Sequence, residues 1–383
     1  MSSKIIHEDY CNFNIGMGWA WCVRLLFAAS YGTMWALFGG ISLPNEPWKR
    51  DGNVQSIHLF VDAMGGDQAP AAPVRGSVAA LRQDPGLHIT LAGILSEIEP
   101  HLLGADDVRD RITLVDAPEV IDNHEAPAMA IRQKKRSSIV MGMLSVREEQ
   151  TDGFVSAGST GAVLIGGMLR LGRIPGIERP ALAPLMPNGK DFFLLIDCGA
   201  NMDCRPEYLA QFGLMGNAYM KQIRGIQVPR IGLVNVGDEA EKGNALIKET
   251  FPLMEQADYH FVGNVEARYI TADRADVMVC DGFAGNIILK FMEGMAETLL
   301  GMIKRELMAD TRSKIGALLA KPAFGRVKKA MDYTEVGGAP LLGVQGAVVK
   351  AHGSSNDYAF ASAIRQASNM VRAQVAQSIQ SQL

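Results

Sequence analysis

The stretch that decides the fold is IHLFVDAMGGDQAP, residues 57–70. It passes directly from an apolar run into an aspartate, two glycines and a second aspartate, which is typical of a buried parallel strand that ends in a tight turn. Asp62 stands at the carboxyl end of the strand, where open α/β sheets place their ligands. Gly65 and Gly66 allow close approaches that a side chain would forbid. A structural turn without a ligand accounts for this stretch equally well.

The same pattern continues along the chain, where short apolar runs alternate with helical stretches from residue 56 onward. This alternation predicts parallel strands joined by crossover helices, and hence a three-layer α/β/α fold with a mostly parallel sheet. Nothing in the composition splits this region, so residues 55–383 are expected to form one α/β/α domain. The expected strands are 57–62, 87–93, 111–116, 153–158, 192–197, 230–237, 260–264 and 276–282, and the expected helices include 285–309 and 357–377.

The composition and the missing motifs exclude several classes of function. A net charge of -4 over 383 residues argues against nucleic-acid binding. Five cysteines form no C-x-x-C pair and no zinc-ligand spacing, which fits a reducing compartment. The absence of P-loop, G-x-G-x-x-G, G-x-S-x-G and H-E-x-x-H motifs disfavours nucleotide binding, serine hydrolysis and zinc proteolysis. We therefore expect neither a cofactor nor a metal.

Residues 1–54 differ in character from the rest of the chain. All four tryptophans lie before residue 50, and residues 15–43 are apolar with Arg24 as their one charge. A membrane anchor, a poorly formed signal peptide and a start codon placed too far upstream each explain this extension. The last interpretation is favoured because the character of the chain changes abruptly at Gly52.

Glycine-containing loops follow nearly every predicted strand, and the carboxyl ends of parallel strands meet at one edge of a sheet. Six such loops with Asp, Asn and Ser predict a polar ligand cleft at that edge. The sharpest is SAGSTG, residues 156–161, where a helix begins at once. Helix N-termini carry free N–H groups and positive partial charge, so this loop is a candidate phosphate site. A capped helix start without a ligand is the structural alternative.

Other loops supply side chains that suit an anionic ligand. The segment DGFAGNIILK, residues 281–290, has the same pattern of a strand end, two glycines and the start of a helix. Arg179 beside Pro180 lies in a rigid loop suited to present its guanidinium. His352 precedes a Gly-Ser-Ser turn and could donate a proton or bind phosphate, although a structural histidine explains it equally well.

Six segments, in order along the chain, resemble the bacterial phosphate acyltransferase family of phospholipid synthesis. They are VDAMGGDQAP, SAGSTGAVL, GIERPAL, DCGANMDCRPEYLAQFG, VCDGFAGNIILK and LLGVQGAVVKAHGSSNDYAFASAIRQA. The resemblance implies transfer of a fatty acyl group from acyl carrier protein to inorganic phosphate, giving acyl phosphate. It also implies a homodimer with a fold similar to phosphotransacetylase and isopropylmalate dehydrogenase. Residues 1–54 have no counterpart in the family, and Ser159 stands where the family motif usually has Asn.

The implied chemistry needs no covalent residue, because phosphate is an anionic nucleophile and a thiolate departs readily. It needs donors that hold phosphate against the thioester carbonyl and stabilise the oxyanion. The predicted phosphate-binding residues are Gly65, Gly66, Ser156, Gly158, Ser159, Thr160, Gly161 and Arg179. The predicted catalytic residues are Asn264, Asn286, Lys290 and His352, with Asp62 and Asp67 orienting basic or amide partners.

Residues 300–335 are expected to form a protruding amphipathic helical hairpin, in which residues 313–332 make two helical pieces around Pro322. A basic amphipathic helix is typical of contact with a membrane surface or an acidic partner such as acyl carrier protein. We therefore expect a cytoplasmic protein that associates peripherally with the membrane, where the glycerol-3-phosphate acyltransferase of the same pathway resides. Packing of the apolar face at a dimer interface is equally open. The candidate contact residues are Ile315, Leu318, Leu319, Phe324, Val327, Lys328 and Lys329.

Two functions of other classes remain open. A dehydrogenase of the same fold would need NAD and a metal, for which Asp197, Asp203 and Asp281 are conceivable ligands, but no dinucleotide fingerprint supports it. A non-catalytic scaffold would carry acyl carrier protein to the membrane through the hairpin.

Overall fold

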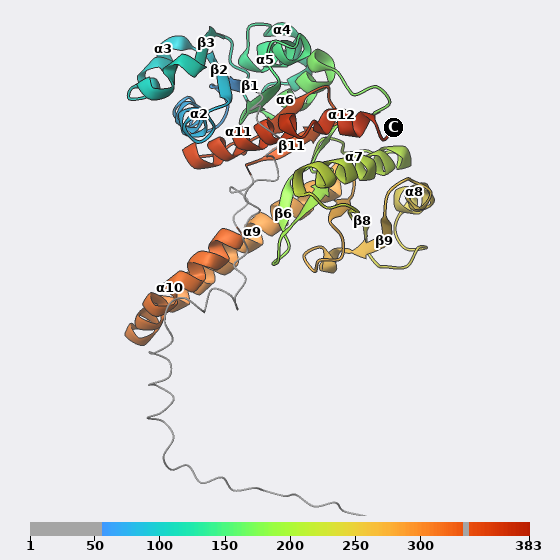
Figure 1. Ribbon diagram of the computed structural model, residues 1–383. Helices are drawn as coiled ribbons and strands as arrows, with labels where there is room; N and C mark the ends of the chain where they lie inside the picture. Colours follow the sequence, from blue (N-terminus) through green and yellow to red (C-terminus); the bar gives the residue numbers. More distant parts are fainter. Residues whose placement is uncertain (1–55, 332–336) are drawn as a thin grey trace, which may run out of the picture. The chain divides into compact units, whose positions relative to one another are not determined.

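The computed structural model describes residues 56–331 and 337–383, without the side chains of residues 328–331. The three interpretations of residues 1–54 therefore concern a segment outside the described residues. The described strands form two sheets rather than the one expected from the sequence (Figure 1). The α/β class and the mostly parallel strands are confirmed.

The first sheet contains the strand formed by residues 57–62 in its interior. Its order is β3-β2-β1-β4-β12-β11-β5, with parallel pairing from β3 to β12 and antiparallel pairing of β11 with both neighbours. The strands are β1 (Ile57–Asp62), β2 (Leu87–Gly93), β3 (Ile112–Asp116), β4 (Gly153–Ser156), β5 (Ala181–Leu182), β11 (Ala339–Leu342) and β12 (Ala347–Lys350).

The second sheet has the order β6-β7-β10-β8-β9, and only β6 is antiparallel to its neighbour. Its strands are β6 (Leu185–Pro187), β7 (Phe192–Ile196), β8 (Ile231–Asn235), β9 (Phe261–Glu266) and β10 (Val277–Val279). The β5–β6 segment links the two sheets in the chain, because β5 ends the first sheet and β6 begins the second.

Helices cover both faces of the strands. They are α2 (Ala71–Gln83), α3 (Leu95–Ile98), α4 (Pro127–Gln133), α5 (Ser138–Arg147), α6 (Thr160–Gly166), α7 (Pro206–Arg224), α8 (Ala245–Glu255), α9 (Gly282–Leu307), α10 (Thr311–Met331), α11 (Asp357–Arg372) and α12 (Val375–Gln380). The 3₁₀ helices are η2 (Glu99–Leu102), η3 (Asp106–Arg111) and η5 (Ala267–Tyr269), and η4 (Gly167–Leu171) is a π-helix that follows α6.

The three layers follow from the alternation of side chains along β1. Leu59 and Val61 pack in a buried cluster that includes Phe360 of α11. Phe60 points to the opposite face and packs in a second cluster with Met143 of α5. Both clusters continue into the second sheet, so each packs against strands of both sheets.

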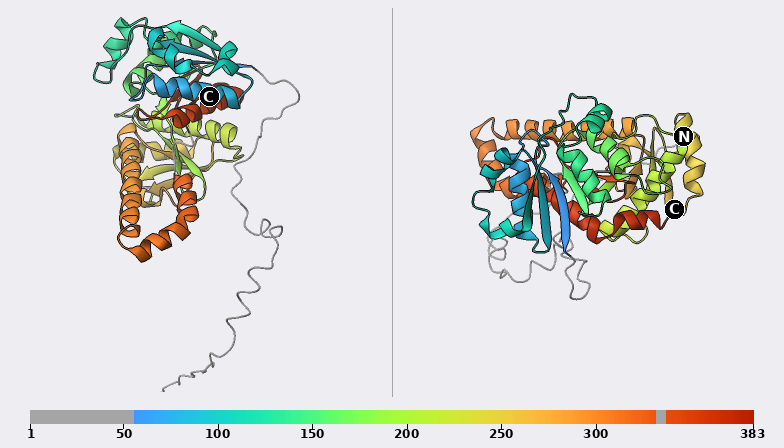
Figure 2. Two further views of the ribbon diagram at one scale, coloured as in Figure 1. Left: turned by 90° about the vertical axis from the view of Figure 1, so that its left-hand side faces the viewer. Right: turned by 90° about the horizontal axis from the view of Figure 1, so that it is seen from above.

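The hairpin differs in one respect from its expected form. Helix α9 leads away from the sheets, and α10 follows it after a turn at the far end of the hairpin (Figures 1 and 2). Pro322 lies inside α10 and does not divide it, so the expectation of two helical pieces is wrong. Proline removes one backbone hydrogen bond, and the remaining bonds keep this helix continuous through residue 322. None of the helices in residues 56–331 and 337–383 is long and apolar enough to cross a membrane.

Candidate active site

Asp62 joins three elements at the carboxyl edge of the first sheet. It is 2% exposed and accepts hydrogen bonds from Ser138 Oγ at 2.6 Å, Ser156 Oγ at 2.7 Å and the Met64 amide at 3.0 Å. Burial raises the pKa of the Asp62 carboxyl, and the two serine hydroxyls oppose that rise. The carboxylate therefore fixes the loop after β1 relative to α5 and the end of β4.

The loops after β1, β4 and β12 approach one another so closely that glycine is required. A Cβ atom on Gly65 would lie 2.4 Å from the Gly158 nitrogen and 2.6 Å from Asp62 Oδ2. Gly66, with φ of +101°, lies against Ala157 and against the carbonyl of Gly353. That carbonyl also accepts the Asp67 amide at 2.8 Å. The loop after β1 thus contacts the loop after β4 and the loop after β12.

The loop at 156–161 uses some of its donors internally and leaves others open. The Gly158 amide donates to Ser156 Oγ at 2.9 Å, and Ser159 caps α6 by accepting the Ala162 amide at 3.4 Å. Within the described chain, the amides of Thr160 and Gly161 have no hydrogen-bond partner, as expected in the first turn of a helix. These two amides and the exposed Thr160 hydroxyl are available to an anionic ligand.

The structure adds a buried lysine that the predicted site residues did not include. Lys350 ends β12, where it is paired in register with Ser156. It is 8% exposed, and its Nζ donates to the carbonyl of Ala157 at 3.3 Å and to that of Ala351. Burial lowers the pKa of Lys350 to about 8, while Asp62 and Asp67 oppose the shift. The apolar run AVV before Lys350, residues 347–349, is typical of a buried strand, but β12 was not among the expected strands.

Two predicted residues, Lys290 of α9 and His352 of the loop after β12, lie near each other. Burial lowers the pKa of His352, and the nearby Lys290 ammonium lowers it further. Lys290 pairs with Glu293 at 2.8 Å and also lowers the pKa of Lys350. His352 Nδ1 lies 2.8 Å from Ser354 Oγ. The start of α9 therefore faces the loop after β12.

Asp197 performs for the second sheet what Asp62 performs for the first. It is fully buried and accepts the amides of Leu182 at 2.9 Å, Ala200 at 3.2 Å and Asn201 at 2.7 Å, together with Asn201 Nδ2 at 3.0 Å. Burial raises the pKa of Asp197 to about 6. The carboxylate is thus surrounded by N–H donors, which suits an anchor and not a metal ligand.

Asn286 is positioned by the same loop. A Cβ atom on Gly285 would lie 1.9 Å from the Asp197 carbonyl oxygen, so α9 begins in direct contact with the end of β7. Gly199, with φ of +107°, lies beside the Asn286 side chain. The side chain of Asn286 therefore lies at the carboxyl edge of the second sheet, beside Gly199.

Two predicted site residues have their described contacts elsewhere. Asn264 lies within β9, where its Nδ2 donates to the Glu239 carbonyl at 2.8 Å. The Arg179 guanidinium lies 5.8 Å from the centre of the Tyr208 ring. None of these described contacts is with the residues around Asp62, and the phosphate and catalytic roles of Asn264 and Arg179 stay predictions.

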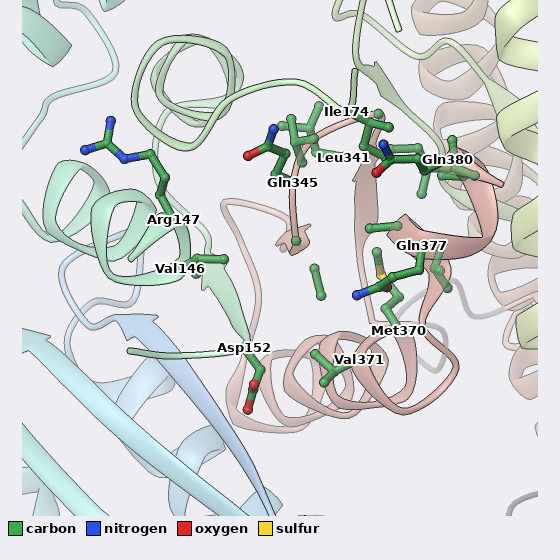
Figure 3. A pocket seen from close by; sticks show the side chains of 18 of the residues that line it. Val146, Arg147, Asp152, Ile174, Leu341, Gln345, Met370, Val371, Gln377 and Gln380 are labelled. Carbon is green, nitrogen blue, oxygen red and sulfur yellow. The ribbon is translucent and has the colours of Figure 1, made fainter. Parts of the chain in front are cut away.

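A cavity of about 510 Å³ lies at the opposite end of the first sheet (Figure 3). It opens between Arg147 at the end of α5, Asp152 before β4, Gln345 before β12 and Gln377 of α12. These positions mark the amino ends of β4 and β12, whereas Ser156 and Lys350 stand at the carboxyl ends. None of the predicted site residues lines this cavity.

Comparison with known proteins agrees with the resemblance seen in the sequence. A family model described as "Fatty acid synthesis protein" matches residues 57–378. A phosphate acyltransferase from Clostridium botulinum is 49% identical over 312 residues, which cover 81% of this chain and 94% of the relative. One from Clostridium acetobutylicum is 47% identical over 309 residues, which cover 81% and 93%.

Solved structures confirm the expected likeness to phosphotransacetylase in fold. A phosphotransacetylase from Streptococcus pyogenes aligns with a TM-score of 0.55 at 18% identity, covering 84% of this chain and 94% of that one. At this identity the alignment speaks for the arrangement of strands and helices alone.

Proposed function

The chain belongs to the fatty acid synthesis protein family, whose relatives above are phosphate acyltransferases, and from that premise we propose that it moves a fatty acyl group from acyl carrier protein to inorganic phosphate, giving acyl phosphate. Family membership makes the chain an acyltransferase that uses phosphate. The dehydrogenase and the non-catalytic scaffold are therefore without support.

The observation that carries the proposal is the meeting of the loops after β1, β4 and β12 around Asp62 and Lys350. These loops combine open amides at Thr160 and Gly161 with a buried ammonium. Such a combination suits a small oxyanion, because backbone N–H groups and a cation both favour negative charge.

The reaction follows from this arrangement. An oxygen of phosphate attacks the thioester carbonyl carbon, and the carbonyl electrons move to its oxygen. Collapse of this tetrahedral intermediate breaks the C–S bond and releases the carrier thiolate, which takes up a proton. Donors fixed before the reaction stabilise the oxyanion without reorganisation. We assign that role to Asn286 and Lys290 of α9 and to His352 of the loop after β12. Its support is the proximity of Lys290 to His352 and the position of Asn286 in the same helix.

Asp62 acts through its neighbours in this mechanism. It holds Ser156, and Ser156 in turn accepts the Gly158 amide. This chain of hydrogen bonds holds the start of the loop in which the Thr160 and Gly161 amides have no partner in the described chain. The backbone amide of Asp67 donates a hydrogen bond to the Gly353 carbonyl in the loop after β12. We therefore propose Asp62, through its carboxylate, and Asp67, through its backbone, as positioning residues.

The partners proposed for the hairpin rest on its exposed apolar side chains. Ile315, Leu318 and Leu319 are 59%, 71% and 78% exposed, and Phe324 and Val327 are also exposed. The side chains of Lys328 and Lys329 lie outside the described part. We propose that this surface contacts the membrane, near the glycerol-3-phosphate acyltransferase, or acyl carrier protein, and that the protein is cytoplasmic.

The proposed catalytic domain is residues 55–383, because the family match begins at residue 57. A homodimer is part of the proposal. Its support is a row of exposed apolar side chains along α9, which a second copy would cover: Phe283, Ile287, Phe291, Met295 and Leu299.

The proposal is tested with acyl carrier protein that bears a fatty acyl group. The release of its free thiol is followed with and without phosphate. We expect release to require phosphate and to saturate with it. Chloride at the same ionic strength is the control for charge screening. Equal release in chloride alone would remove the proposed reaction.

A further inference from the structure

Lys350 is a buried cation whose charge has no carboxylate partner at ion-pair distance within the described chain. Its Nζ donates to the carbonyls of Ala157 and Ala351, and an ammonium has three donors. Two carbonyl dipoles replace only part of the solvation that an ammonium loses when it leaves water. A buried lysine of this kind is stabilised further when an anion reaches it.

Asp62, Asp67 and Lys290 are the charged groups around Lys350, and two of them, Asp62 and Lys290, are engaged with other partners. Asp62 accepts from Ser138, Ser156 and the Met64 amide. Lys290 of α9 is paired with Glu293. The local charges therefore leave Lys350 as the buried cation that an anionic ligand can meet.

Lys350 also lies beside the loop with the open amides. It is the register partner of Ser156 across β12 and β4, and its Nζ holds the carbonyl of Ala157, the next residue along the chain. The same ammonium thus fixes the start of the 156–161 loop and places positive charge beside it.

We propose that Lys350 binds the substrate phosphate, together with the amides of Thr160 and Gly161. The proposal rests on the proposed function for the identity of the anion. It adds a phosphate-binding residue, and it distinguishes Lys350 from the Lys290 of α9, which has a carboxylate partner of its own.

The first test replaces Lys350 by methionine in the full chain and measures steady-state kinetics. Loss of a charge-assisted hydrogen bond should raise the KM for phosphate by about 10-fold to 100-fold. The KM for the acyl donor should not change. Lys221→Met on the exposed side of α7 is the matched control and should leave both constants unchanged. An unchanged phosphate KM in Lys350→Met overturns the proposal.

The second test needs no acyl donor, so it separates this proposal from the proposed function. Inorganic phosphate at constant ionic strength should raise the Tm of the wild-type protein and of Lys221→Met, since a ligand that binds the native state stabilises it. It should not raise the Tm of Lys350→Gln, whose amide can still donate to the Ala157 carbonyl. An equal rise in Lys350→Gln contradicts the proposal. A rise in Tm with phosphate only when Lys350 is present, without consumption of acylated carrier protein, would support the Lys350 proposal and contradict the acyl donor in the proposed function.

Discussion

Two buried carboxylates, Asp62 and Asp197, hold the loops of the two sheets. Each stands at or just after the end of a parallel strand, and each accepts hydrogen bonds from groups distant in sequence. Burial raises the pKa of both carboxyls, and the surrounding donors oppose that rise. At the scale of single residues, the site is therefore set by anchors that need not touch the substrate.

The Asp197 anchor predicts a loss of stability on a nearly isosteric change. Asp197→Asn places an NH₂ group, which cannot accept, among four N–H donors. Leaving buried donors unpaired should reduce the free energy of unfolding by about 1–3 kcal/mol. Chemical denaturation measures this change, with exposed Asp203→Asn as the control. Equal stability of the two variants would contradict the role assigned to Asp197.

Lys350 predicts a pH dependence with a definite sign. Its pKa is lowered to about 8, so the ammonium is charged below that pH and neutral above it. The kcat/KM for phosphate should therefore fall as the pH rises through about 8, because this ratio reports groups of the free enzyme. The same profile of Lys350→Gln controls for the other titrating groups, including Asp62, Asp67, Lys290 and His352. A fall of the same size in that variant would show that another group titrates.

At the scale of elements, contacts between glycine and backbone bring α9 and the loops together. Gly285 lies against the carbonyl of Asp197, and Gly65 lies against the amide of Gly158. Both contacts join segments far apart in the chain. Glycine at these positions permits close packing, and the open amides of the site are a separate feature at Thr160 and Gly161.

Two glycines of α9 provide a matched test of this distinction. A Cβ atom on Gly285 would lie 1.9 Å from the Asp197 carbonyl oxygen, whereas one on Gly294 would meet nothing within 4 Å. Gly285→Ala should destabilise the protein by about 1–3 kcal/mol or more through overpacking. Gly294→Ala should stabilise it by about 0.5–1 kcal/mol through helix propensity. Thermal unfolding compares them, and equal Tm values would contradict the packing at residue 285.

The sequence predicted the elements that carry long apolar runs and missed those that do not. Strands such as 57–62 and 87–93 were predicted at their observed bounds, because each is a buried run between turn signals. Strands β5, β6, β11 and β12 have two to four residues, and three of the four lie in proline- or glycine-rich segments. Short antiparallel pairs of this kind depend on tertiary contacts.

The site was predictable to the same extent. The loops after β1 and β4 were recognised because their glycines and polar residues directly follow predicted strands. Lys350 was not assigned a role because its position beside Ser156 depends on β12, which was not expected. The anchoring role of Asp197 also depends on a missed strand, since it accepts the amide of Leu182 in β5.

At the scale of the whole molecule, the carboxyl edge of the first sheet and the hairpin differ in character. The edge is polar and its loops pack closely, while α10 presents apolar side chains such as Leu318 and Leu319 to solvent. Chemistry and contact with a membrane or carrier are therefore assigned to separate surfaces. Changes at one surface should leave the other intact.

The hairpin assignment predicts a loss of membrane binding without a loss of folding. Leu318→Ser and Leu319→Ser together should weaken sedimentation with anionic lipid vesicles, because each buried leucine contributes about 1.5–3 kcal/mol. The Tm should not fall, since these side chains are 71% and 78% exposed. Leu103→Ser, at a position 86% exposed outside the hairpin, should bind vesicles as the wild-type protein does. Unchanged sedimentation of the double variant would refute membrane contact through these leucines.

The central claim is that phosphate itself attacks the acyl thioester, and ¹⁸O-labelled phosphate tests it most directly. The full chain is incubated with labelled phosphate and acyl carrier protein that bears a fatty acyl group, and the acylated products are weighed by mass spectrometry. The account predicts an acyl phosphate that retains every labelled oxygen of the phosphate, including the one that bridges to the acyl carbon. Unlabelled free fatty acid as the only product would contradict it.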